Sequence, residues 1–128
     1  MASKRHHIII PTDLKPRPKP HEESAAVILS KHFESDVRFI KNSNYESPDV
    51  SIRGVEWEIK SPIGDSKNNI QKNIREAARQ SNNIVIDLRR SKLHQARALG
   101  YIKQYLDHPN NIKRLIVITK SEKVLVLK

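Results

Sequence analysis

Residues 48–60 constrain the fold more than any other stretch, because apolar and polar residues alternate there in two short runs. The apolar positions are Val50 and Ile52 in the first run and Val55, Trp57 and Ile59 in the second. A period of two is typical of strands that bury one face. The two residues between the runs, Arg53 and Gly54, suit a tight turn. The stretch therefore predicts a β-hairpin.

The predicted hairpin brings two carboxylates together. A turn at Arg53-Gly54 pairs Ile52 with Val55, so Asp49 falls opposite Glu58. Directly opposed side chains lie about 5 Å apart at Cβ, where like charges are destabilising. Lys60 lies on the same strand face as Glu58. Two carboxylates with a lysine beside them favour a divalent cation held by oxygen ligands, and the alternative is an exposed ladder of ion pairs.

Pro48-Asp49 followed by Glu58-Ile59-Lys60 resembles the signature of the PD-(D/E)xK nuclease superfamily. This superfamily includes restriction endonucleases, Holliday-junction resolvases and toxin nucleases that cleave DNA or tRNA. The resemblance implies a metal-dependent endonuclease that hydrolyses phosphodiester bonds, with Asp49, Glu58 and Lys60 as catalytic residues. It also implies that Asp49 and Glu58 hold Mg²⁺ or Mn²⁺, with Zn²⁺ as an alternative, and that the Ile59 carbonyl is a further ligand.

A first helix is predicted over residues 21–33, because apolar residues such as Leu29 recur at helical spacing after Pro20. Glu22 lies on the same face as Leu29, whereas Glu23 is rotated by about 100°. In the nuclease superfamily an acidic residue of this helix often completes the metal site. The resemblance gives that catalytic and metal-binding role to Glu22, with Glu23 as the alternative. Both residues also suit the positive end of the helix dipole without any catalytic role.

The remaining elements follow in a regular order. We expect a strand at 36–40, a polar loop at 42–47, a helix at 67–80, a strand at 83–88, a helix at 91–106, and strands at 115–118 and 124–127. A strand, helix and strand in sequence predict a crossover with parallel pairing. The expected fold is α/β, with a PD-(D/E)xK restriction-endonuclease-like core (helix, three strands, helix, strand), an extra helix and two C-terminal strands.

A narrower resemblance covers the residues after the hairpin. The matching residues are Trp57 to Pro62, Asn69-Ile70, Ala78, Gln80 and Ile84 to Asp87. Together they resemble the C-terminal toxin nucleases of bacterial contact-dependent growth inhibition systems, several of which cleave tRNA. The resemblance implies an RNA substrate, action in the cytoplasm and a cognate immunity protein as partner. A chain beginning with Met1 departs from those toxins, in which the nuclease is the tail of a very large protein.

Residues 1–20 differ in composition from the rest of the chain. Four prolines between Pro11 and Pro20 exclude a helix and alternate with Lys15, Arg17 and Lys19. We expect a Pro-rich basic arm, either binding phosphate or loosely docked, ahead of a single domain at 21–128. Within this arm, residues 8–10 could add an edge strand.

The net charge of +10 is unevenly distributed along the 128 residues. Residues 1–66 are neutral, whereas residues 67–114 carry 11 Lys or Arg and 3 Asp or Glu. A basic surface beside an acidic metal site suits nucleic acid, because phosphate contacts dominate affinity. Candidate substrate contacts are Ser61, Arg75, Arg79, Gln80, Arg89, Arg90 and Lys92. Such contacts bind phosphate in RNA and DNA alike.

Other readings remain open. The absence of cysteine excludes disulfides and thiolate metal sites, and no apolar run reaches the roughly 18 residues of a membrane span. His94 could be the general base of a metal-free ribonuclease, or a surface residue. A DNA endonuclease or resolvase of the same fold would be expected to form a dimer. A catalytically inactive, phage-associated nucleic-acid-binding module is the alternative from another class.

Overall fold

The computed structural model of the chain describes residues 6–41 and 48–128, so the loop predicted at 42–47 lies outside the described residues. The strands are β1 (Ile8–Ile9), β2 (Val37–Phe39), β3 (Val50–Ile52), β4 (Val55–Lys60), β5 (Asn83–Asp87), β6 (Arg114–Ile118) and β7 (Val124–Val126). The helices are α1 (Pro20–Phe33), α2 (Lys67–Gln80) and α3 (Gln95–Asp107). Within the described residues, these strands form one mixed sheet whose order, β1 to β7, follows the chain.

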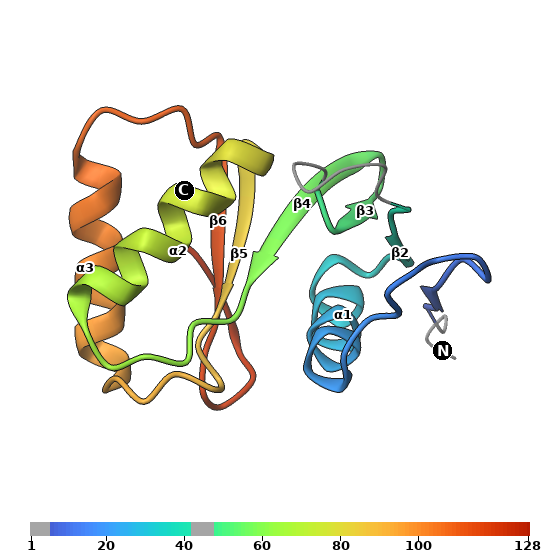
Figure 1. Cartoon of the computed structure of the whole chain (residues 1–128), viewed down its shortest axis with the longest axis horizontal. Helices are drawn as coiled ribbons and strands as arrows, with labels where there is room; N and C mark the ends of the chain where they lie inside the picture. Colours follow the sequence, from blue (N-terminus) through green and yellow to red (C-terminus); the bar gives the residue numbers. More distant parts are fainter. Residues whose placement is uncertain (1–5, 42–47) are drawn as a thin grey trace.

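The sheet separates α1 from α2 and α3 (Figure 1), and an apolar layer packs on each of its faces. Val85 and Ile116 pack on the side of α1, together with Trp57 and Leu29. Their neighbours along each strand point the other way and pack against α2 and α3. Strands covered on both faces are expected to be almost continuously apolar, as β5 and β6 are. The result is a mixed α/β fold with helices on both faces of the sheet.

The predicted hairpin is confirmed in position and register. Ile52 pairs with Val55 across the turn, and Val50 pairs with Trp57. Arg53 and Gly54 have φ angles of 50° and 78°, the left-handed region that a two-residue hairpin turn requires. The crossover prediction is also confirmed, because β4, β5 and β6 pair in parallel.

Helix α2 has the predicted bounds, but α3 begins four residues later than predicted. His94 is the residue before its first turn, and the Nδ1 atom of His94 accepts a hydrogen bond from the Ala96 N–H at 3.3 Å. Just before it, the hydroxyl of Ser91 accepts the Leu93 N–H. These side-chain contacts hold residues 91–94 in a turn and offer the backbone an alternative to helix.

The segment before α1 is more closely integrated than a loosely docked leader. Ile8 and Ile9 form β1, which pairs in parallel with β2, as the edge-strand prediction allowed. Leu14 is buried in the layer beneath α1. The apolar residues on either side of Pro11 therefore attach this part of the chain to the domain. No helix in the described parts of the chain is long and apolar enough to cross a membrane.

Candidate active site

Asp49 is positioned by the hairpin ladder. Its backbone N–H donates to the Trp57 carbonyl at 3.0 Å, which extends the pairing of β3 and β4 by one residue. Its carboxylate Oδ2 accepts the N–H of Ile59 at 2.9 Å. The side chain is thereby held at the strand end, opposite Glu58, as the sequence predicted.

Glu58 is a buried carboxylate, only 3% exposed. Its Oε2 lies 3.3 Å from the Nζ of Lys60. Its Oε1 is buried and has no hydrogen-bond partner among the described residues. Burial, followed by the charge of Asp49, raises the pKa of Glu58 from 4.5 to about 9. One lysine therefore does not supply enough positive charge for this carboxylate.

The two carboxyl groups interact directly. Burial also raises the pKa of Asp49, while its hydrogen bond with Glu58 and the Ile59 N–H act in the opposite direction. Two acids in this arrangement favour sharing one proton over carrying two negative charges. A positive charge placed next to the pair would favour its ionised form.

Glu22 lies in the first turn of α1, near this pair. Its Oε1 accepts the backbone N–H of Lys19 at 2.9 Å, so it caps the helix. Its negative charge contributes to raising the pKa of Asp49. Among residues 6–41 and 48–128, no three His, Asp or Glu side chains are grouped closely enough to hold a metal ion. The metal-binding roles predicted for Glu22 and the Ile59 carbonyl, and the alternative of Glu23, stay predictions.

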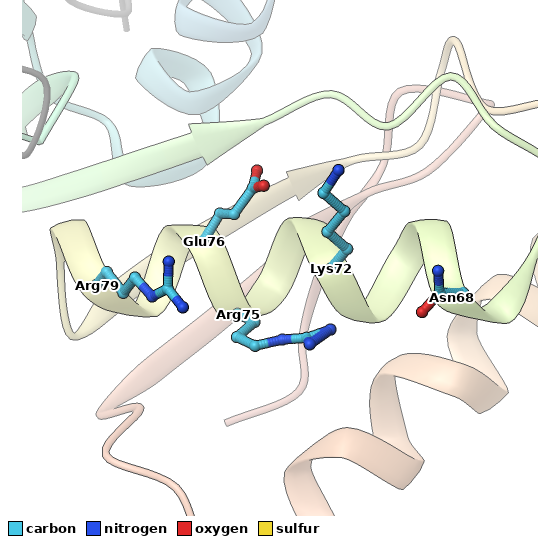
Figure 2. Close-up of a pocket in the computed structure, with 5 residues that line it drawn as sticks. All are labelled: Asn68, Lys72, Arg75, Glu76 and Arg79. Atoms are coloured by element: carbon cyan, nitrogen blue, oxygen red, sulfur yellow. The ribbon is translucent and has the colours of Figure 1, made fainter.

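The predicted substrate contacts differ in how exposed they are. Ser61 directly follows β4, and its Oγ is buried without a hydrogen-bond partner in the part of the chain that the structure describes. Gln80 is half-buried at the end of α2. Arg75 and Arg79 are exposed on the same helix, where Figure 2 shows them beside Asn68, Lys72 and Glu76. These five residues line a shallow pocket of about 310 Å³.

Arg89 is held by protein groups. It donates from Nε and a terminal nitrogen to both carboxylate oxygens of Asp87, at 3.0 and 2.8 Å. It also donates to the Ser24 hydroxyl and the His21 carbonyl of α1. Asp87 is fully buried. This contact joins the end of β5 to the start of α1, which favours a positioning role for Arg89.

Sequence reasoning assigned no role to Asp87. The sequence does place Asp87 at the end of a predicted buried strand and two residues before Arg89, a pattern that could have indicated their ion pair. Arg90 contacts the ring of His21 at 2.8 Å, and Lys92 is exposed. The substrate contacts predicted for these two residues remain untested, as does a general-base role for His94.

The fold is a mixed α/β domain with one seven-stranded sheet in the described residues. The structure is similar to a CdiA-CT/CdiI toxin and immunity complex from Burkholderia pseudomallei, with a TM-score of 0.68 and 24% identity. The match covers 95% of this chain and 98% of that chain, so the two share a fold over nearly their whole length. No curated protein matches the sequence significantly.

The family is shown by the sequence itself. Residues 46–124 match the contact-dependent growth inhibition CdiA C-terminal domain, and the chain belongs to this family. The match includes the hairpin, α2, β5, α3 and β6. The resemblance to contact-dependent growth inhibition toxins is therefore confirmed.

Proposed function

We propose that this toxin domain is a metal-dependent endonuclease of the PD-(D/E)xK type that hydrolyses RNA, with tRNA as the foremost substrate. The observation that supports it most is the carboxylate pair of half-buried Asp49 and buried Glu58, with Lys60 beside it. The pair lies on the hairpin position that carries the superfamily signature. The helix–three strands–helix–strand order of α1 to β5 agrees with that core.

The donor set fits a divalent metal ion. The unpartnered Oε1 of Glu58 and the raised pKa values of both carboxyl groups point to missing positive charge. Asp49 and Glu58 would hold Mg²⁺ or Mn²⁺, or Zn²⁺ as the alternative, and Glu22 or the Ile59 carbonyl would complete the oxygen ligands. A metal bound there supplies an activated water and neutralises charge that develops on the phosphate.

Lys60 and Ser61 supply the groups of this chain that act on the phosphate. The Lys60 side chain is 22% exposed, so its ammonium lies between the buried Glu58 and solvent. From there it can stabilise negative charge on a phosphate oxygen during hydrolysis. The Ser61 hydroxyl, one residue on, can donate to the same group. The Ile59 N–H already holds the Asp49 carboxylate in this position, so its side chain needs no rearrangement.

Helix α2 provides the surface for the rest of the substrate. Lys72, Arg75 and Arg79 follow one another along its solvent face, and none of them forms an ion pair with another described residue. The rise of about 1.5 Å per residue spreads these cations over about 10 Å. A row of cations of this length suits a phosphate backbone, because phosphate contacts dominate nucleic-acid affinity. We call Lys72, Arg75 and Arg79 the α2 stripe.

The proposed partners follow from the family. The similar structure is a toxin and immunity complex. We propose that this chain likewise has a cognate immunity protein, and that it acts on nucleic acid in the cytoplasm of a target cell. A DNA endonuclease of the same fold and an inactive nucleic-acid-binding module are the competing functions.

The decisive experiment measures cleavage of total tRNA and of plasmid DNA side by side, with Mg²⁺, Mn²⁺, Zn²⁺ or EDTA. Wild type is compared with Asp49→Ala, Lys60→Ala and the surface control Lys103→Ala on α3. We expect metal-dependent cleavage of tRNA that is lost in the first two variants and retained in the control. Cleavage of DNA alone would favour the DNA endonuclease. Cleavage that survives in both site variants would move the chemistry elsewhere, with His94 as the next candidate.

A further inference from the structure

A second pocket lies on the α1 side of the sheet, at the end opposite the carboxylates. Its volume is about 290 Å³. Strand β4 begins before β5 at this end of the sheet: Ile84 pairs with Glu58, which puts Asn83 level with Trp57 and leaves Val55 beyond the start of β5. The lining residues are His32, Phe33, Ile52, Arg53, Val55, Trp57, Arg114, Ile116, Val126 and Lys128. We call this the α1–β7 pocket.

The interior of the α1–β7 pocket is apolar and aromatic. Trp57 and Ile116 are almost fully buried, and the Phe33 ring lies 5.6 Å from the Trp57 ring, between centroids. Val126 of β7 is 63% exposed, the highest value among the exposed large apolar residues of the described chain. A large aliphatic side chain at the lip of an apolar pocket is typical of a contact surface.

The rim of the pocket is cationic. Arg53, Arg114 and Lys128 form hydrogen bonds only to neutral acceptors within the described residues: the Glu34 carbonyl, the Asn83 side chain and the Asn110 side chain. None of these three side chains forms an ion pair with a carboxylate of the described residues. An occupant that brings its own carboxylates would therefore gain favourable electrostatics around an apolar centre.

The pocket continues along the edge of the sheet. An adjoining hollow of about 350 Å³ also borders His32. Its other lining residues are Ile28 and Lys31 of α1, Glu122, and Val124 of β7. Strand β7 is the last in the sheet, so one of its edges is unpaired within residues 6–41 and 48–128. Unpaired edges are sites where extended segments of other proteins add to a sheet. The shape therefore favours an extended protein segment over a compact small molecule.

From this combination we infer that the α1–β7 pocket is a docking site for an acidic, extended segment of a partner protein. The segment places one apolar side chain against Phe33 and Val126, and its carboxylates meet Arg53, Arg114 and Lys128. This surface is separate from the proposed catalytic site. Helix α1 spans the distance, with Glu22 at one end and Phe33 at the other, which is about 17 Å along the helix.

The test uses Trp57, the only tryptophan of the chain, as an internal reporter. The probe is the acetylated heptapeptide EDEFEDE, titrated into the full chain while Trp57 fluorescence is recorded. We expect a saturable change. The peptide EDEAEDE, which lacks the apolar anchor, and the charge-reversed KRKFKRK should each bind at least ten-fold more weakly.

Matched variants complete the test. Val126→Asp and Lys128→Glu should each weaken EDEFEDE binding at least five-fold. Val27→Asp and Lys103→Glu make the same two substitutions outside the pocket lining, at an exposed valine of α1 and at a lysine of α3. Both variants should bind EDEFEDE like wild type. Equal affinity for EDEFEDE and EDEAEDE, or unchanged binding in Val126→Asp, would each overturn the inference. None of these readouts depends on the nuclease proposal.

Discussion

At the residue scale, the proposed site concentrates its electrostatic cost in Glu58. The side chain is buried next to a second carboxylate, and one of its oxygens has no partner among the described residues. Burial of an uncompensated charge is unfavourable, so the metal-free protein keeps a proton there up to an unusually high pH. We propose that the buried Glu58 lowers the stability of the metal-free protein and allows the site to bind a cation.

The pH dependence of stability tests this arrangement. The folded protein binds the Glu58 proton with a pKa of about 9, whereas the ordinary value of 4.5 applies to the unfolded chain. The stability that this group contributes is complete below 4.5 and is lost as the pH rises toward about 9. Thermal unfolding in EDTA should therefore show a Tm that falls over this interval.

Glu58→Gln removes the titration and provides the comparison. In EDTA we expect the Tm of this variant to fall less steeply with pH than that of wild type, and to exceed it at pH 8. Addition of Mg²⁺ or Mn²⁺ should raise the Tm of wild type and leave the variant unchanged. Parallel pH profiles for the two proteins would contradict the buried, protonated Glu58.

At the element scale, the hairpin turn depends on backbone conformation alone. Gly54 has φ of 78°, and a Cβ added there would meet nothing within 4 Å. Gly54→Ala should therefore destabilise the protein by about 1 kcal/mol through backbone strain. The same change in α3, Gly100→Ala, also meets nothing, and should stabilise the protein by about 0.5–1 kcal/mol because alanine favours helix. Urea unfolding should show a lower free energy of unfolding for Gly54→Ala and a higher one for Gly100→Ala.

The α2 stripe predicts a measurable salt dependence. Binding of tRNA to an inactive Asp49→Ala background should weaken as salt increases, because phosphate contacts release counterions. Arg75→Ala and Arg79→Ala should each reduce the slope of log K against log salt by about one. Lys103→Ala on α3 is the charge-matched control and should leave the slope close to that of wild type. An unchanged slope in both arginine variants would show that the substrate lies elsewhere.

The elements that sequence could predict are those fixed by local pattern. Alternation around Arg53-Gly54 gave the hairpin register, and the spacing of Ile70 and Ile74 gave α2. The start of α3 was missed because His94 caps it, a contact that apolar periodicity does not register. The α1–Arg89 contact was missed for a different reason, since Ser24 and Arg89 are 65 residues apart.

At the scale of the whole molecule, Arg89 and Asp87 link the end of β5 to the start of α1. Arg89→Ala would leave the Asp87 carboxylate buried without its cation and would free the start of α1. Removing one partner of a buried pair typically costs about 3–5 kcal/mol. Arg90→Ala, at the exposed neighbouring position, should cost about 0.5 kcal/mol or less. Urea unfolding compares the two, and similar losses would contradict the linking role of Arg89.

The order of the strands has a mechanical consequence. Since β1 to β7 lie side by side in chain order, the first strand forms one border of the sheet and the last strand forms the other. A force applied to either end of the chain therefore meets a border strand first. Once that strand is peeled away, its neighbour becomes the new border. We expect this domain to unzip strand by strand under tension, with no strand needing to be drawn out from between two others.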